Sequence, residues 1–278
     1  MLKDLFFPVT GAATDDAAIE IAASIASAYD ARLVATVPAP AYAPLATPWG
    51  VTPDSVALAE MLDLVESDAR KRMESLRARF RDLEPACEIR MDPDHFFAPA
   101  RSLARQARYA DVSVIACPSG TDGETAHAYF RALLFESGRP VLVVPTTPVP
   151  ATRFSKMLVA WKPTRETTRA VHDAVALFSP VSAEVMAIDP DISVFEHGAE
   201  PGADIATHLA RHRIRTQVTT RASGGASIAQ VLLAHAKETR ADLIVAGGYG
   251  HARLREWILG GATRDLFEGL DVPVLFSH

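Results

Sequence analysis

Glycines that could surround a phosphate gather in one stretch near the C-terminus. The stretch reads GGYGHARLREWILGGATRDLF and covers residues 247–267. Glycine adopts positive φ angles and lets another group approach the backbone closely. The spacing of Leu254 and Ile258 predicts a short helix, whose first N–H groups and dipole favour an anion such as phosphate. Gly260 and Gly261 end this helix and ATRDLF begins another, so two sets of backbone donors are expected close together.

The glycines alone leave two interpretations open, because turn and helix-cap glycines explain their spacing as well as a phosphate site does. Two better-known phosphate motifs do not fit. The chain lacks the G-x-x-x-x-G-K-[ST] pattern of a P-loop. Gly248 and Gly250 begin a G-x-G-x-x-G pattern, but Arg253 stands where the third glycine should be. We therefore do not expect an NAD site.

The elements around the glycines alternate between strand and helix. Short apolar runs predict buried strands, and apolar residues three and four apart predict helices, one of them with Thr164 as N-cap. In the second half we expect strands at 156–161, 183–189, 216–222, 241–248 and 272–276, and helices at 164–178, 203–212 and 227–240. This alternation predicts an α/β fold with a parallel sheet and helices on both faces. Ligands of such sheets bind at the carboxyl ends of the strands, where the strand order reverses.

The chain repeats this pattern once, and an internal repeat is strong evidence for architecture. Four blocks recur in the same order, at offsets of 152, 152, 131 and 133 residues; they are 5–11 and 157–163, 30–40 and 182–192, 110–120 and 241–250, and 139–145 and 272–278. The falling offset places about 21 extra residues in the first half. We expect them in a helical insertion at about 38–82, made of a proline-rich loop and a helix at about 55–82. The predicted domains are 1–147 and 154–278, with 146–153 as the linker.

Composition excludes several classes of protein. The 278 residues are 49% hydrophobic and 22% charged, an ordinary globular balance. The net charge of -6 argues against general binding of nucleic acid or of an anionic membrane, so neither is an expected partner. No apolar run approaches the roughly 20 residues of a membrane span, and the N-terminal run is too short for a signal peptide. Cys87 and Cys117 are too few for a disulfide framework, so we expect reduced thiols in a cytoplasmic protein.

The glycine pattern in its context resembles a known family. Gly247, Gly250 and Gly260 form G-x2-G-x9-G between ADLIV and VPVL, which is similar to the nucleotide loop of the universal stress protein family. The repeat makes the chain similar to tandem members of that family. The resemblance implies two Rossmann-like domains of the adenine nucleotide α-hydrolase type, each a five-stranded parallel sheet. It also implies pairing through the last strands, 139–145 and 272–276, as an internal pseudo-dimer, with a homodimer as a further expectation.

The resemblance further implies a ligand, a site and a role. The ligand would be ATP or another adenine nucleotide, with Mg²⁺ on its phosphates, and the role would be regulation of a stress response. The implied adenine side is Ala160, Trp161, Ile188 and Asp189. The implied phosphate side is Gly247, Gly248, Gly250, His251, Arg253, Gly260, Gly261, Ala262 and Thr263.

Three departures from the family pattern limit this expectation. Gly261 stands where a Ser or Thr is usual, and Thr263 either replaces the lost hydroxyl or caps the next helix. Trp161 and Lys162 stand where an acid is usual, and Trp161 either stacks on adenine or packs. The first half has lost the loop spacing, with Thr10 in place of the acid, so at most one site is expected. The alternative is a scaffold in the stress response that binds no nucleotide and acts by dimerising with partner proteins.

Two further groups of residues have types and spacings that could serve a function. His208 and His212 have the i, i+4 spacing that zinc ligands can have, but no third ligand is evident, so we expect surface histidines. Asp15, Asp16 and Glu20 are expected to stabilise the start of the first helix through its dipole. The sequence shows no Ser-His-Asp constellation and no paired carboxylates, and it identifies no base for ATP hydrolysis, so an enzyme is not expected.

Overall fold

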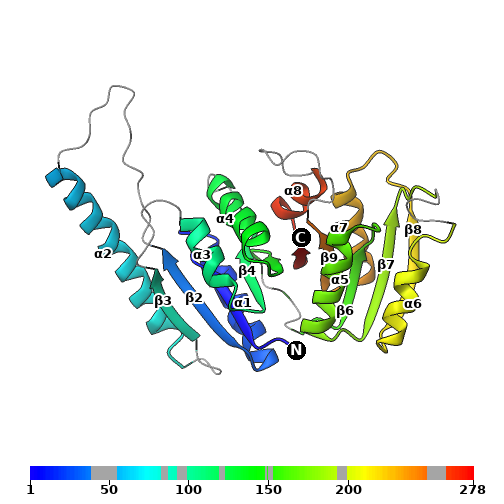
Figure 1. Cartoon of the computed structure of the whole chain (residues 1–278), viewed down its shortest axis with the longest axis horizontal. Coiled ribbons are helices and arrows are strands. Elements are labelled where there is room, and N and C mark those ends of the chain that lie inside the picture. Colours follow the sequence, from blue (N-terminus) through cyan, green and yellow to red (C-terminus); the bar gives the residue numbers. More distant parts are fainter. Residues whose placement is uncertain are drawn as a thin grey trace.

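The computed structural model describes residues 1–38, 55–82, 87–92, 99–118, 123–147, 149, 153–192, 199–248 and 261–278. Its strands form one ten-stranded sheet with the order β3-β2-β1-β4-β5-β10-β9-β6-β7-β8, flanked by helices (Figure 1). Strands and helices alternate along each half of the chain, which confirms the α/β prediction.

The elements have the following bounds. The first half contains β1 (Asp4–Pro8), α1 (Asp15–Tyr29), β2 (Arg32–Pro38), α2 (Ser55–Arg79), β3 (Cys87–Asp92), α3 (Pro99–Ala107), β4 (Val112–Ala116), α4 (Gly123–Glu136) and β5 (Val141–Val144). The second half contains β6 (Lys156–Ala160), α5 (Arg165–Phe178), β7 (Ser182–Ile188), α6 (Ala203–Arg211), β8 (Arg215–Arg221), α7 (Ile228–Thr239), β9 (Leu243–Gly247), α8 (Gly261–Glu268) and β10 (Val274–Ser277).

The two halves share one strand topology. In each half the five strands are parallel, and the first strand lies between the second and the fourth. The halves meet where β5 pairs antiparallel with β10, for example Val143 with Val274. This pairing is the internal pseudo-dimer that the family resemblance implies. The domain boundaries at 147 and 154 stay predictions.

The sequence repeat was misaligned by two residues in one block. Asp4 pairs with Arg32 in the first half, whereas Lys156 pairs with Ser182 in the second, so β2 and β7 correspond at an offset of 150 residues rather than 152. A strand pattern has a period of two, so a slip of two residues matches it equally well and keeps every side chain on the same face.

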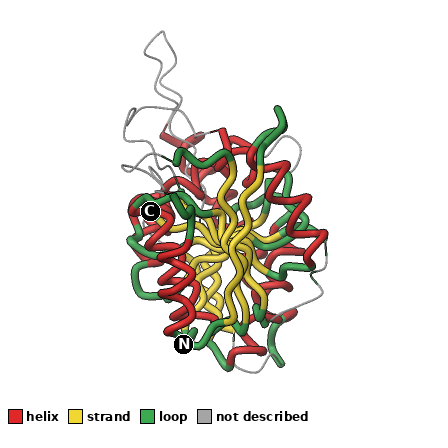
Figure 2. The backbone as a smooth tube through the Cα atoms, turned by 90° about the vertical axis from the view of Figure 1, so that its right-hand side faces the viewer, coloured by secondary structure: helices red, strands yellow, loops and turns green. Residues whose placement is uncertain are grey.

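The helices form two layers, one on each face of the sheet (Figure 2). Apolar residues of α1, α2, α5 and α6 share one buried cluster, and those of α3, α4, α7 and α8 share the other. The second cluster spans the junction of the halves, where the ring of Phe130 stacks on that of Phe267 at a centroid distance of 4.4 Å. The two halves therefore have continuous cores.

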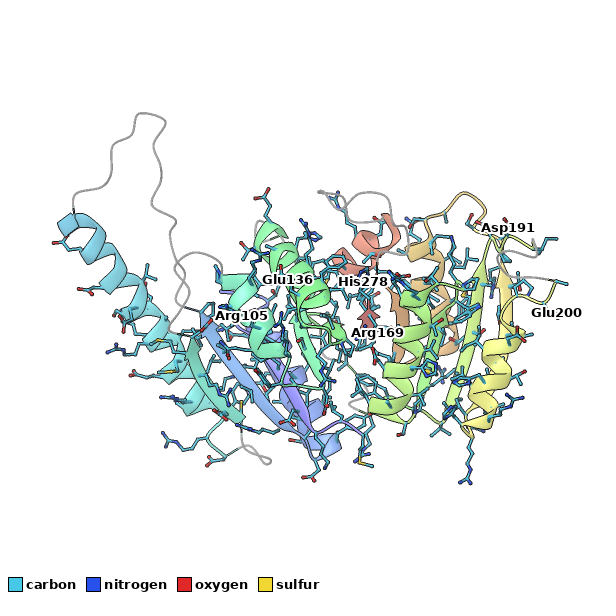
Figure 3. All side chains as sticks on the ribbon, viewed as in Figure 1. Arg105, Glu136, Arg169, Asp191, Glu200 and His278 are labelled. Carbon is cyan, nitrogen blue, oxygen red and sulfur yellow. The ribbon has the colours of Figure 1, made fainter. Side chains whose placement is uncertain are left out.

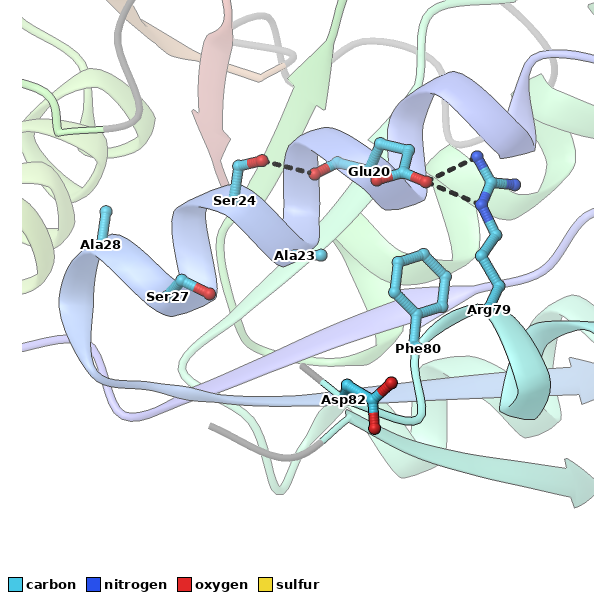
Figure 4. A pocket seen from close by; sticks show the side chains of 8 residues that line it. All are labelled: Glu20, Ala23, Ser24, Ser27, Ala28, Arg79, Phe80 and Asp82. Atoms are coloured by element: carbon cyan, nitrogen blue, oxygen red, sulfur yellow. Dashed lines mark hydrogen bonds and ion pairs between the residues drawn. The ribbon is translucent and has the colours of Figure 1, made fainter. Parts of the chain in front are cut away.

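Helix α2 lies within the range in which the sequence predicts a helix, at about 55–82. Val65, Ala69 and Leu76 are buried toward the sheet. On the other side, Arg79 pairs with Glu20 and with Asp16 of α1, and a groove of about 720 Å³ lies beside this pairing (Figure 4). Asp16 and Glu20, expected to act through the helix dipole, thus also join α1 to α2.

The structure also bears on disulfide bonds and membrane-spanning helices. Neither Cys87 nor Cys117 forms a disulfide bond. Within the described ranges, no helix is long and apolar enough to cross a membrane. The predicted helix at 252–259 lies outside the described residues.

Candidate functional site

The predicted site residues border the point at which the strand order of the second half reverses. Strand β6 lies between β7 and β9, and Ala160 at its end pairs with Ala246 of β9. Trp161 and Gly247 follow these two residues directly. Open α/β sheets bind ligands at such a reversal, outside the carboxyl ends of the strands. The structure therefore brings the adenine side and the start of the glycine loop to one place.

Gly247 is required by a helix that packs against it. A Cβ atom at this position would lie 2.6 Å from the backbone nitrogen of Thr167 and 2.7 Å from its Oγ1. Real Cβ atoms do not make contacts this short, and a backbone atom cannot move aside cheaply. The absence of a side chain at Gly247 thus allows the first turn of α5 to reach the end of β9.

Gly248 makes room for the other half of the chain. A Cβ atom there would lie 2.7 Å from Cδ2 of Leu134 in α4. The N–H of Gly248 donates to Ser277 O at 2.8 Å, and the Nδ1–H of His278 donates to Gly248 O at 3.1 Å. Figure 3 shows His278 at the junction of the halves. Two glycines of the predicted phosphate loop are therefore explained by packing.

Gly261 differs from these two glycines. It is the first residue of α8, and no described atom would lie within 4 Å of a Cβ atom built there. Ala262 follows in the same helix turn, and Thr263 is 6% exposed. The other predicted phosphate residues, Gly250, His251, Arg253 and Gly260, lie outside the described residues.

The residues of the predicted adenine side point in two directions. Ala160 and Ile188 pack, partly buried, against the cluster under α7 and α8. Trp161 packs against the opposite cluster, with its Cδ1 3.8 Å from a Cβ atom built at Gly202. This contact favours packing as the role of the Trp161 ring.

Asp189 has a left-handed backbone conformation, and its carboxylate is hydrogen-bonded to Ser223. Its φ angle is 44°, in the left-handed region. Its Oδ1 accepts the N–H of Ser223 at 3.0 Å. Hydrogen bonds from the side chain of Ser223 and from its backbone N–H hold the pKa of the carboxyl below its usual value. Asp189 is thereby tied to the loop that follows β8.

The N-terminus of α5 is already occupied by side chains of the protein. The hydroxyl of Thr164 accepts the N–H of Thr167 at 3.3 Å. Glu166 is 6% exposed; burial raises its pKa, but hydrogen bonds from its own backbone N–H and from Arg165 outweigh burial and lower the pKa overall. A carboxylate in the first turn complements the helix dipole. A ligand anion is therefore disfavoured at this helix.

The corresponding loop of the first half is also filled by a carboxylate. Asp15 is 1% exposed and accepts the N–H groups of Thr10 and Gly11, both at 2.8 Å, and the Thr10 hydroxyl at 2.8 Å. Burial raises the pKa of Asp15 to about 6, although these hydrogen bonds act in the opposite direction. Asp15, expected to act through the dipole of α1, therefore mainly binds the loop that follows β1.

A buried polar network in the second half was not predicted from the sequence. The Nε2–H of His235 donates to Oε1 of Glu184 at 2.7 Å, and Thr219 donates to the same oxygen at 2.7 Å. Arg221 donates to Nδ1 of His235 at 3.2 Å, beside a cavity of about 330 Å³. Burial raises the pKa of Glu184, but the hydrogen bonds lower it overall. The signal in the sequence was a single Glu inside the apolar run AEVMAI.

The second half of the chain matches a model of a known protein family. The model of the universal stress protein family matches residues 153–278. No curated protein matches the chain.

Solved structures share the fold over the full chain. The universal stress protein from Archaeoglobus fulgidus DSM 4304 covers 98% of this chain and 94% of its own, with a TM-score of 0.67 and 14% identity. A functionally unknown protein from Pseudomonas aeruginosa PAO1 covers 99% and 92%, with a TM-score of 0.54 and 14% identity. At such identities the likeness establishes the fold, and it extends over both halves.

Proposed function

Because residues 153–278 belong to the universal stress protein family, we propose that the second half binds an adenine nucleotide, with ATP as the first candidate. The protein would act in the cytoplasm as a nucleotide-dependent regulator of a stress response, without catalysing a reaction of its own. One site per chain is proposed, since the first half lacks the spacing of the glycine loop.

The observation that carries this proposal is the place of the glycine loop in the sheet. The loop begins at Gly247, next to the end of β6, where the strand order reverses. That position is the general ligand site of open α/β sheets. Ala160 and Ile188 present an apolar surface beside it, which suits a purine ring.

The arrangement of helix ends supports a location for the phosphates. Thr164 and Glu166 already satisfy the start of α5, so that end is unsuited to an anion. Helix α8 begins at Gly261 with open space around its Cα among the described residues. Its first N–H groups would bind the phosphates, with Thr263 in the first turn of the helix. Mg²⁺ would be held mainly by phosphate oxygens, since it prefers them to all-protein sites.

The first experiment measures the nucleotide directly. The full chain is purified without added nucleotide and denatured, the released small molecules are identified by mass spectrometry, and the protein is titrated with ATP and Mg²⁺ by calorimetry. We expect ATP, or one heat-releasing site for it, near one per chain.

A matched pair of variants tests the site. Gly261 and Gly123 are the first residues of α8 and α4, and neither has a described atom within 4 Å of its missing Cβ. Gly261→Val fills the proposed phosphate space and should weaken ATP binding at least about tenfold, or 1.4 kcal/mol. Gly123→Val imposes a similar change on the other half and should leave the affinity unchanged. Equal affinities of the two variants would rule out this site.

The scaffold remains the second candidate, because packing explains Gly247 and Gly248 without a ligand. It requires that neither released nucleotide nor binding heat is found and that the chain forms larger assemblies in solution. A bound nucleotide in the wild-type protein excludes it.

A further inference from the structure

Three histidine rings lie together on the surface of the second half. His208 lies on α6, His212 is the residue that caps this helix, and His172 lies on α5. The centroids of the His172 and His208 rings are 5.0 Å apart, and those of His208 and His212 are 4.7 Å apart. His172 and His212 are exposed, and His208 is half-buried.

The structure supplies the ligand that the sequence lacks. His208 and His212 stand one helical turn apart, a spacing that allows both rings to bind one metal ion, and no third ligand is evident from their neighbours in the sequence. Helices α5 and α6 pack on the same face of the sheet. This packing brings His172 beside His208, although 36 residues separate them along the chain.

We propose that His172, His208 and His212 bind a zinc ion. Zinc accepts imidazole nitrogens at about 2.0–2.1 Å in a tetrahedral arrangement, which places the centroids of two ligating rings about 5 Å apart. The two ring separations in the structure match this value. Three protein ligands leave the fourth position to water, as in an open zinc site.

The rings must turn to bind. As they stand they are inclined to each other at 62° and 58°, and no three ligand groups among the described residues converge on one metal position. Exposed histidine side chains change rotamer on the picosecond to nanosecond scale, so the two outer rings can redirect a nitrogen without disturbing the core.

Metal binding requires the neutral form of the imidazole ring. Since ligating histidines must be deprotonated, the affinity should fall as the pH decreases below the range in which imidazoles titrate.

The test is a zinc titration of the full chain. The protein is treated with EDTA, dialysed, and titrated with Zn²⁺ against a chromophoric chelator in the absence of nucleotide. We expect one zinc per chain. A second titration uses Co²⁺, whose visible absorption reports tetrahedral coordination by nitrogen ligands. No zinc binding in competition with the chelator would overturn the proposal.

Single variants identify the ligands. His172→Ala removes the ligand on α5 and should weaken zinc binding about 10- to 100-fold, the range seen even for groups that only support a zinc ligand. His208→Ala should do the same. His278→Ala, an exposed histidine at the junction of the halves, is the control and should leave the affinity unchanged. Thermal unfolding of each variant checks that the fold persists.

One result distinguishes the proposed three-histidine site from a site made by His208 and His212 alone. If His212→Ala abolishes binding while His172→Ala binds zinc as tightly as the wild type, two histidines of α6 suffice and the three-ligand site is wrong. The titration is independent of the proposed nucleotide site, because no residue is shared between the two.

Discussion

The two halves of the molecule differ most in the loops that follow their first strands. In the first half, the carboxylate of Asp15 binds the N–H groups of the β1–α1 loop. In the second half, Thr167 stands at the corresponding position and contacts the end of β9 instead. The first half has thus placed a buried negative charge at the edge where the second half is proposed to bind a nucleotide. The second half occupies the same helix end with Thr164 and Glu166, so its proposed phosphate position lies at α8 instead.

The ends of the fourth strands show the same divergence. Ala116 and Cys117 of the first half correspond to Gly247 and Gly248 of the second, because Cys117 and Gly248 donate equivalent N–H groups to β5 and β10. Cys117 donates its thiol to Phe267 O at 3.1 Å, whereas Gly248 faces Leu134. Cys117 and Gly248 occupy equivalent positions, but Cys117 contacts Phe267 across the junction, whereas Gly248 contacts Leu134.

The largest expected effect is at the junction that joins the halves. Phe267 is 0% exposed and stacks on Phe130. Phe267→Ala should lower the free energy of unfolding by about 3–5 kcal/mol, the usual cost of truncating a buried phenylalanine. Denaturant unfolding measures this loss. Phe135→Ala is the control, since Phe135 lies at the same junction but is 41% exposed and should cost much less. Equal losses would contradict the packing at Phe267.

The buried charge of the first half should appear in the pH dependence of stability. Burial raises the pKa of Asp15 to about 6 in the folded protein, from an ordinary value of 3.8. The folded state then binds the proton more tightly, so the contribution of Asp15 is greatest below about pH 4 and is lost as the pH rises to about 6. The whole change is on the order of 3 kcal/mol.

Asp15→Asn removes this titration and should flatten the curve of unfolding free energy between pH 4 and 6, relative to the wild type. Asp16→Asn changes the neighbouring carboxylate, whose side chain is 52% exposed, and should keep the wild-type slope. Urea unfolding at a series of pH values measures both variants. A wild-type slope in Asp15→Asn would show that the carboxylate is not buried as described.

A smaller loss of stability should distinguish the two glycines at the end of β9, Gly247 and Gly248. Gly247→Ala places a methyl group against the backbone of α5 and should cost about 1–3 kcal/mol, as overpacking does. Gly248→Ala meets only the flexible end of Leu134 and should cost less. Thermal unfolding compares the pair. If Gly247→Ala were as stable as the wild type, the close approach of α5 to β9 would be wrong.

The fold could be predicted because its evidence is periodic and repeated. Alternating strands and helices predict a parallel sheet, and the repeat of RPVLVVP as VPVLF predicts two similar halves. The two-residue slip in β2 shows the limit of such evidence, since a period of two does not fix the register. The N-cap at Thr164 was predictable because capping depends on neighbours in sequence.

The candidate site was harder to predict because its contacts join distant parts of the chain. The spacing of Gly247 and Gly248 suggested a phosphate, but the atoms that exclude a side chain there belong to Thr167 and Leu134. The pair formed by Glu184 and His235 and the approach of His172 to His208 likewise depend on helix packing. Sequence spacing reports local geometry, and none of these contacts is local.

The antiparallel pairing of β5 with β10 has an evolutionary consequence. In a symmetric homodimer every interface substitution appears twice, once in each subunit. Here both partners belong to one polypeptide, which keeps them at a high effective concentration and allows each to mutate alone. Cys117 and Gly248 could therefore diverge without either having to be compatible with a copy of itself. The covalent link keeps the two halves paired even when selection for ligand binding no longer acts on one of them.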